Sequence, residues 1–410
     1  MGQGVSSGPG AIDTAFSSSA AGVLRRTQLA IAELLFGAGL EGARSTAVGR
    51  ELGLDKTLAW KVSRFAREAD PLRAARHMPG VGGVKILLEA AGAFGVSRDR
   101  IEAVRQADAD FRSFVEEQAG DLRTFEAILS GSGRDAAAEF EQRRTYYQSG
   151  AAIWGVRASA QFLMLALCPS GLGDGMLDVV QTGGFDRLER LKPDTPWIVR
   201  RLLTTTDDGG RRLTFVREPL DPAGITSPKA IPLLREYCSD PLPGIRQFEG
   251  SDGVVYDEVL PGPLGPGGAV TVVTGEVYRG AVPSARSDEN RVGRYKLTVR
   301  TPVKHVLLDV LVHKELTHFG PMSMSVKGLL EGRPPAATQE RGQLGAGNAS
   351  PAKRLGTPPV LKTSRMSTYE SVARRALALA GYTPADFCGY RAAMDYPTAP
   401  GEIILTCDIH

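Results

Sequence analysis

Cysteine is scarce in this sequence, and the cysteines that are present lie far apart. The 410 residues contain four, at positions 168, 238, 388 and 407, and no two of them have CxxC spacing. Four scattered thiols cannot cross-link a chain of this size, and none has the spacing of zinc ligands. We therefore expect free thiols, as in a cytoplasmic protein, with no disulfide framework, structural metal or cofactor.

Long hydrophobic runs are also missing. The most apolar stretch, residues 162–168, is ended by Pro169 and is far shorter than the ~20 residues that span a bilayer. The first residues lack the basic start and apolar core of a secretory signal. These absences favour a soluble, cytoplasmic protein with no membrane partner.

A strong charge of either sign is absent from the chain as a whole. The formal net charge is only +3, so a nucleic-acid surface can exist only as a local patch. The apolar fraction of 42% and the charged fraction of 23% are ordinary for globular proteins and exclude wholesale disorder. A chain of 410 residues has room for two or three domains.

The usual catalytic signatures are missing too. There is no GxSxG elbow, no phosphate-binding loop and no paired CxxC. His305, Asp309 and His313 share one face of an expected strand, but the two histidines would lie about 26 Å apart and cannot hold one ion. We expect these to be solvated polar residues, and the sequence offers no catalytic or metal-binding set.

The first part of the chain has a helical pattern. Residues 1–20 are mostly Gly, Ser and Ala and are expected to form a flexible tail. From there to residue 133, apolar residues recur at helical spacing, as at Leu24, Ile31 and Leu34. We predict a helical region over residues 21–133.

Residues 134–168 are predicted to form one long connecting helix, or two nearly collinear ones interrupted around Ser149 and Gly150. Such a helix either carries a signal between two domains or packs as part of the second domain. The pattern does not separate the two alternatives.

Beyond Pro169 the apolar period changes to two, which is typical of half-buried strands. Residues 294–300 and 305–313 are predicted to form a hairpin around a turn at residues 301–304. A short helix is predicted over residues 228–237. Further strands are predicted at residues 176–181, 197–205, 212–217, 253–259, 269–279 and 321–326.

The last part of the chain divides into an insert and a return to order. Residues 332–359 are rich in Gly, Pro, Ala and Gln and are predicted to be a flexible insert. Residues 360–410 are predicted to complete the domain with a helix over 368–381 and strands near Tyr390 and at 402–406. The fold class is therefore multidomain, with an N-terminal all-α region and a C-terminal α+β or β-rich domain, residues 169–331, of mostly antiparallel strands.

One short segment, residues 45–65, carries most of the functional argument. Gly49 is a small residue where two helices would cross, and Gly53 tolerates the positive φ of a turn between them. Asp55 can cap the second helix. The positions that must hold the two helices together are apolar, namely Val48, Leu52, Leu54, Ala59 and Val62.

This segment resembles the helix-turn-helix DNA-binding transcriptional regulators, over about twenty residues only. One departure is Gly49, where that family usually has alanine. The resemblance implies that a second helix, residues 56–65, enters the major groove of double-stranded DNA. Lys56, Thr57, Trp60 and Lys61 would then face the bases, and Ser45, Thr46, Arg64 and Arg67 the phosphates.

The local charge agrees with this implication. Residues 41–77 hold eight Lys or Arg and five Asp or Glu, a balance of +3, whereas the expected helix at 98–121 is acidic. The alternative is a helix-turn-helix that makes only protein contacts, or a chance match within a helical bundle. Trp60 fits either case, because its indole can pack against the first helix instead of meeting DNA.

The sequence therefore predicts a transcription regulator. Residues 21–133 are its all-α helix-turn-helix region for DNA binding and dimerisation, and its C-terminal effector domain senses a small molecule or a protein. We also expect a homodimer, because paired motifs read two half-sites and because the Phe111 and Phe114 stripe and the long connecting helix offer apolar surface. An enzyme with an unrecognised site in the C-terminal domain is the first alternative, and an assembly protein is the second. The lack of a catalytic constellation favours the regulator.

Overall fold

The computed structural model divides the chain into two compact units, up to Ala138 and from Glu139 to His410, which are described separately. The structure describes residues 9–132, 136–171, 175–193, 195–202, 216–222, 231–242, 244–251, 254–283, 292–329 and 350–410.

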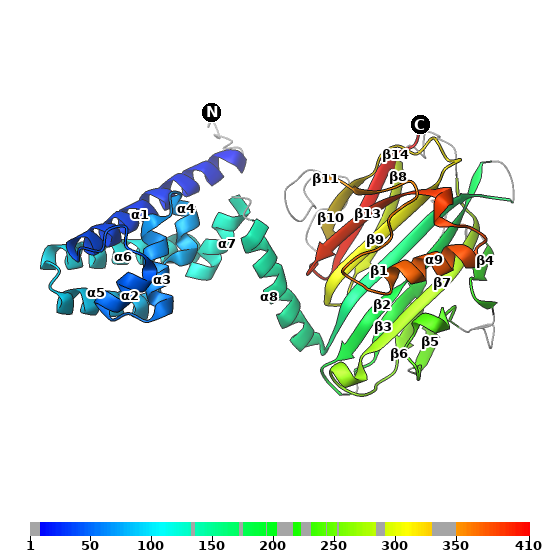
Figure 1. Cartoon of the computed structure of the whole chain (residues 1–410), viewed down its shortest axis with the longest axis horizontal. Helices are drawn as coiled ribbons and strands as arrows, with labels where there is room; N and C mark the ends of the chain where they lie inside the picture. The colour runs from blue at the N-terminus through cyan, green and yellow to red at the C-terminus, as the bar shows by residue number, and fades with distance from the viewer. Residues whose placement is uncertain are drawn as a thin grey trace, which may run out of the picture. The chain divides into compact units, whose positions relative to one another are not determined.

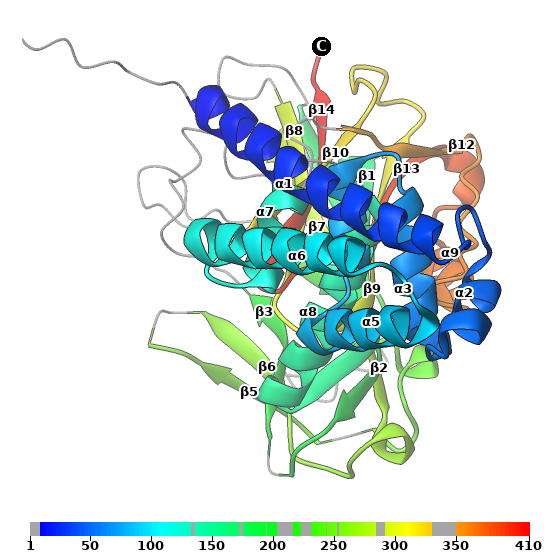
Figure 2. The same cartoon turned by 90° about the vertical axis from the view of Figure 1, so that its left-hand side faces the viewer.

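The first unit is built from helices (Figures 1 and 2). A 3-10 turn over Ala75–His77 follows its fourth helix. The helices are α1 (Pro9–Gly37), α2 (Ser45–Leu52), α3 (Lys56–Arg67), α4 (Pro71–Ala74), α5 (Val81–Phe94), α6 (Arg98–Ala119) and α7 (Leu122–Ser132).

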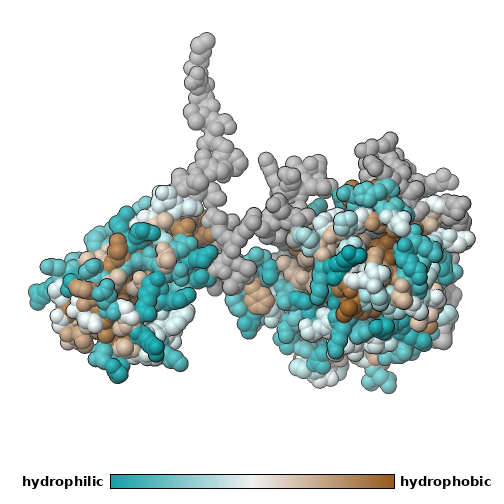
Figure 3. Space-filling view, turned by 45° about the horizontal axis from the view of Figure 1, so that its top comes forward, coloured by the Kyte–Doolittle hydropathy of each residue, from teal (hydrophilic) through white to brown (hydrophobic). Residues whose placement is uncertain are grey.

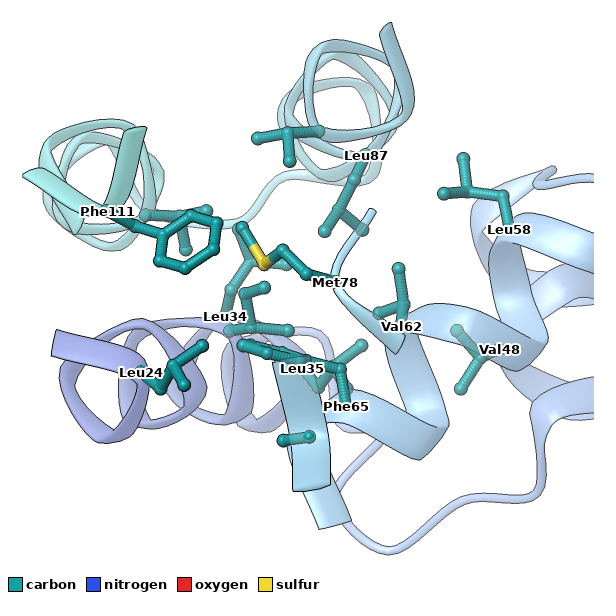
Figure 4. Packing of buried hydrophobic residues seen from close by; sticks show 14 of the residues in the cluster. Leu24, Leu34, Leu35, Val48, Leu58, Val62, Phe65, Met78, Leu87 and Phe111 are labelled. Carbon is teal, nitrogen blue, oxygen red and sulfur yellow. The ribbon is translucent and has the colours of Figure 1, made fainter. Parts of the chain in front are cut away.

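A single hydrophobic core joins these helices. Figure 4 shows Leu34, Leu87 and Phe111 converging around Met78, although they come from different helices. α1 lies along α6 and also contacts α3. Gln28 on α1 donates hydrogen bonds of 2.8 and 2.9 Å to the carbonyl oxygens of Phe65 and Glu68. It therefore satisfies carbonyl groups that the end of α3 leaves without a helical partner.

The prediction of a tail over residues 1–20 is wrong for its second half. α1 begins at Pro9, and Ala20 is fully buried. The first eight residues lie outside the described part of the chain. Gly and Ser lower helix propensity, but the contact of α1 with the rest of the unit outweighs that preference.

The second unit is a set of three sheets with one long and one short helix. Helix α8 (Ala136–Trp154) leads into it, and Phe140 and Tyr147 of α8 pack against Tyr396, with ring centroids 5.3 Å apart in each pair.

The seven-stranded sheet has the order β12-β13-β9-β1-β2-β7-β4, the four-stranded sheet β11-β10-β14-β8 and the three-stranded sheet β3-β6-β5. The strands are β1 (Val156–Pro169), β2 (Met176–Arg190), β3 (Trp197–Leu202), β4 (Val216–Pro219), β5 (Ile245–Glu249), β6 (Val255–Val259), β7 (Val270–Pro283), β8 (Val292–Val299), β9 (Val303–His313), β10 (Ser323–Gly328), β11 (Ser350–Pro351), β12 (Lys353–Gly356), β13 (Phe387–Asp395) and β14 (Gly401–Asp408).

The seven-stranded sheet is covered on both faces. Helix α9 (Tyr369–Leu379) lies across one face, where Tyr369 meets Phe162 of β1 with ring centroids 5.7 Å apart (Figure 1). The four-stranded sheet packs on the other face, where Leu163 and Leu165 of β1 join its core. Among the described strands, all pairings are antiparallel except that of β1 with β9. The predicted division into a helical region and a mostly antiparallel β-rich domain is thus confirmed.

The predicted connecting helix over residues 134–168 is wrong in its second half. The helix ends at Trp154, and Val156–Pro169 is the central strand β1. Because both faces of this strand are covered, residues 162–168 are apolar without alternation. A short apolar run of this kind does not distinguish a buried strand from a buried helix.

The predicted hairpin of residues 294–300 and 305–313 is also wrong, although both strands exist. β8 pairs with β14 in the four-stranded sheet, whereas β9 lies between β1 and β13 in the seven-stranded sheet. The turn between them therefore crosses from one layer to the other. Alternation of apolar residues identifies a strand but says nothing of its partner.

Asp309 and His313 are not the solvated residues that the sequence predicts. Asp309 is fully buried on the face of β9 that α9 covers. It accepts two hydrogen bonds of 2.7 Å from Arg391 and one of 2.6 Å from Tyr369. His313 is only 8% exposed. The covering helix removes this face from water, which strand periodicity alone cannot reveal.

Two smaller predictions need correction. In the described part of residues 228–237 there is a 3-10 turn at Arg235–Tyr237 but no α-helix. Leu233 instead forms an antiparallel bridge with Thr274, and the amide of Leu234 donates to the carbonyl oxygen of Val273 of β7. In the predicted flexible insert 332–359, residues up to 349 lie outside the described part, but β12 pairs with β13. The helix over 368–381 and the strands near Tyr390 and at 402–406 are confirmed as α9, β13 and β14.

The surfaces of both units in the view of Figure 3 are mostly hydrophilic, with hydrophobic side chains in small groups. Within the described residues, no helix combines the length and the hydropathy needed to cross a membrane.

Candidate nucleic-acid interface

The segment singled out by the sequence forms two helices joined by a tight turn. α2 ends at Leu52, and Gly53 follows in the left-handed conformation with φ of 64°. The amide of Leu54 then donates to the carbonyl oxygen of Gly49 at 2.9 Å. Glycine adopts this backbone conformation without the steric cost that a Cβ brings, so Gly53 has the predicted role in the turn.

Gly49 lies where α2 comes close to α3. A Cβ added there would be 3.2 Å from the Cβ of Ala59 and 3.2 Å from the carbonyl oxygen of Leu54. Both distances are shorter than ordinary van der Waals contact, so the predicted need for a small residue is confirmed. The glycine allows the two helices to approach more closely than any larger side chain would.

Asp55 caps α3 as the sequence predicts. Its carboxylate accepts hydrogen bonds of 2.8 Å from the amide of Thr57 and 3.0 Å from the amide of Leu58. These amides belong to the first turn of the helix, where no carbonyl group is available to them. The cap fixes the position at which the exposed side chains of α3 begin.

One face of α3 is wholly buried. Leu58, Ala59, Val62 and Phe65 are at most 6% exposed and pack into the core of the helical unit (Figure 4). The other apolar positions predicted to join the helices, at Val48, Leu52 and Leu54, are also buried. The opposite face of α3 is therefore the one that meets solvent.

That opposite face carries most of the predicted contact residues. Lys56, Thr57, Arg64 and Arg67 are exposed, and Lys61 is half-buried. The indole of Trp60 is 47% exposed. No Asp or Glu occurs in the helix sequence from Lys56 to Arg67. This face is cationic, with one large aromatic side chain at its centre.

A surface hollow of about 730 Å³ lies between α2 and the start of α3, and we call it the α2–α3 hollow. Ser45 and Thr46 line it from α2, and Lys56, Thr57 and Trp60 line it from α3. Five of the eight predicted residues thus meet around one concavity. Lys61, Arg64 and Arg67 lie outside its lining, farther along α3.

Two of the predicted phosphate contacts already have partners within the protein. Arg64 lies 3.8 Å from the carboxylate of Glu68, and Arg67 donates a hydrogen bond to the carbonyl oxygen of Ala43. The Arg64 side chain is 57% exposed, so its ion pair is weak and exchanges readily for another anion.

Sequence reasoning missed two residues near this site. Arg50, on α2, lines the α2–α3 hollow, and its place one turn after Thr46 is a signal that could have indicated it. His77 lies against the indole of Trp60. It is 17 residues away in the sequence, and no local pattern connects the two.

The protonation of His77 is disfavoured in this position. Burial lowers the pKa of the imidazole, and the positive charges of Arg76, Arg64 and Lys61 lower it further, while Glu68 opposes them. A neutral ring therefore supports Trp60 around neutral pH.

Known proteins resemble this chain only distantly. No protein-family model matches it, and no curated protein matches it in sequence. A solved structure from Parabacteroides distasonis ATCC 8503, described as a proposed protease, matches 62% of this chain and 40% of its own length, with 9% identity and a TM-score of 0.24. The chain thus corresponds to less than half of that protein. Likeness this low carries no argument about fold or function.

Proposed function

We propose that this chain is a transcription regulator that binds double-stranded DNA through α2 and α3 acting as a helix-turn-helix. The observation that carries the proposal is the division of α3 into two faces, one buried in the core and one cationic. Lys56, Thr57 and Trp60 lie in the first turns of α3, from which side chains of a recognition helix reach base edges. Arg64 lies farther along, at a position suited to the DNA backbone.

The concave shape of the site supports the same proposal. The start of α3 and the start of α2 form the two sides of the α2–α3 hollow, and both sides carry donors. A helix-turn-helix places the second helix in the major groove while the first crosses the backbone. Ser45 and Thr46 at the start of α2 then donate to a phosphate, and the helix N-terminus favours the negative charge.

The homodimer remains part of the proposal, but fewer observations support it than the sequence analysis expects. Phe111 is buried and the half-buried Phe114 packs on Phe16 and Phe125 within the unit, so this stripe offers little surface to a partner. The remaining argument is that two motifs read two half-sites on one face of DNA. We expect light scattering to show two protomers on each bound duplex.

A comparison of specific with random DNA tests how α3 meets the bases. A preferred duplex is selected from a random library with the whole chain, and affinities for it and for scrambled DNA are then measured. Lys61→Ala should lower the affinity for the preferred duplex by about 10-fold or more. A lysine that donates to guanine favours this base over a wrong one by ~1–3 kcal/mol. The affinity for scrambled DNA should change much less.

Lys85→Ala is the matched control, because Lys85 is an exposed lysine on α5 outside the site. It should leave both affinities unchanged. Equal losses on preferred and scrambled DNA in Lys61→Ala would mean that Lys61 contacts only phosphate, and the proposed placement of α3 would then be wrong.

A further inference from the structure

The second unit contains two adjoining hollows on the face of the seven-stranded sheet that is turned away from α9. Their volumes are about 290 and about 750 Å³. Gln181 lines both of them. Residues of β1 form part of both linings, with Leu165 and Leu167 in the smaller hollow and Gln161 and Leu163 in the larger. Residues 161–167 of a strand extend about 20 Å. We call the two hollows together the sheet groove.

The smaller hollow is the apolar end of the sheet groove. Tyr295 of β8 and Phe319 line it beside the two leucines, and Ala281 of β7 lies at its wall. Apart from Gln181 and the exposed Arg294, its lining is formed by apolar and aromatic residues and one glycine. A lining of this kind suits a hydrocarbon chain better than a polar ligand.

The larger hollow contains buried polar atoms that lack hydrogen-bond partners among the described residues. Asp257 is fully buried, and its Oδ2 lies 3.0 Å from Nε of Arg200, but the two are too poorly aligned to form a hydrogen bond. Oε1 of Gln161 likewise has no donor among the described residues. Unpaired buried polar atoms are rare in native structures and indicate a missing water or ligand.

The charges of the ion-pair network at this end balance. Arg200 contacts both Asp257 and Glu276, and Glu276 is also paired with Arg217. These two arginines and two carboxylates leave no net charge. Arg300 and Arg201, which lies over the ring of Tyr256, also line the hollow, and both are exposed. The rim is therefore cationic and attracts an anionic group.

We propose that the sheet groove binds a long-chain carboxylic acid. The hydrocarbon tail occupies the apolar end between Leu165 and Phe319, and the carboxylate lies at the rim near Arg201 and Arg300. Water that accompanies the carboxylate supplies the donor that Gln161 lacks. The role of this ligand as an effector rests on the proposed DNA binding, but its binding is measured without DNA, so the two proposals fail separately.

Calorimetric titration of the whole chain with dodecanoate, below its micellar concentration, tests the proposal. Dodecanoate should bind at least tenfold more tightly than dodecylamine, which has the same tail and the opposite charge. Hexanoate should bind more than a hundredfold more weakly, because each buried methylene contributes about fourfold to the affinity. Equal binding of the acid and the amine, or no binding of dodecanoate at millimolar concentration, overturns the proposal.

Three variants locate the ligand. Arg300→Glu should weaken dodecanoate binding at least tenfold, whereas Arg235→Glu, an exposed arginine outside the lining, should leave it unchanged. Ala281→Phe narrows the apolar end and should weaken the binding of dodecanoate much more than the binding of hexanoate. Thermal unfolding of each variant verifies that it is folded. Folded variants that all bind dodecanoate like the wild type would place the ligand elsewhere and contradict the proposal.

Discussion

The imidazole of His77 meets the indole of Trp60 edge-on, with ring centroids 5.2 Å apart and planes at 85°. His77 is 9% exposed, whereas Trp60 is 47% exposed. The buried ring thus supports the aromatic side chain at the centre of the cationic face. Its protonation would add a positive charge beside Arg64 and Arg76, which already lower its pKa.

This arrangement predicts a pH dependence of stability. Because the pKa of His77 is lowered below 6.5 in the folded state, the unfolded chain binds the proton more tightly. The stabilisation is therefore complete above pH 6.5 and is lost as the pH falls toward the folded pKa. Chemical denaturation of the helical unit at pH 7.5 and 5.5 measures this loss. His77→Gln should lose less stability between these pH values, and an equal loss in both proteins would contradict the assignment.

Gly53 should be essential to the turn between α2 and α3 only because of its left-handed backbone conformation. A Cβ at this position meets no atom within 4 Å, so Gly53→Val tests only the left-handed conformation. The cost should be about 1–3 kcal/mol of unfolding free energy. Gly53→Asn should cost less, because asparagine tolerates this conformation.

Gly82→Val is the matched control for Gly53, since Gly82 lies within helix α5, has no positive φ and has open space around it. It should change the unfolding free energy by no more than about 0.5 kcal/mol. We also expect Gly53→Val to lose affinity for preferred and scrambled DNA together. If Gly53→Val is as stable as the wild type, the turn accepts a side chain at position 53 and this prediction is wrong.

The buried ion pair of Asp309 and Arg391 should be costly to break from one side. Asp309→Asn leaves the guanidinium of Arg391 buried without its counter-charge, so we expect a loss of about 3–5 kcal/mol. Glu370→Gln breaks an exposed pair with Arg374 on α9 and should cost only about 0.5 kcal/mol or less. Equilibrium denaturation of the second unit compares them. Similar losses in the two variants would mean that Arg391 finds another partner.

The α2–α3 segment could be predicted from the sequence because its determinants are local. Gly53 and Asp55 each act on a backbone group within a few residues, and the apolar positions repeat at helical spacing. Cap, turn and buried face are therefore as predicted. The exposed residues of α3 followed from the same periodicity, since a helix with one buried face must expose the other.

The second unit was harder to predict because its determinants are distant. β1 is covered on both faces, fully on one and partly on the other, so its apolar run resembled a helix. β8 and β9 were recognised as strands, but their partners lie far away in the sequence. Asp309 is paired with a residue 82 positions later. The sheet groove was missed for the same reason, because residues from β1, β3 and β8 form it together.

The salt dependence of DNA binding shows whether the cationic face of α3 binds DNA at all. Fluorescence anisotropy of a labelled duplex of mixed sequence, titrated with the whole chain between 50 and 200 mM salt, gives the affinity at each concentration. Binding should be measurable at 50 mM and fall steadily as salt rises. Arg64→Ala should weaken binding to all sequences alike and reduce the slope of log K against log salt by about one. No binding at 50 mM salt, or an affinity that does not change with salt, would contradict the account.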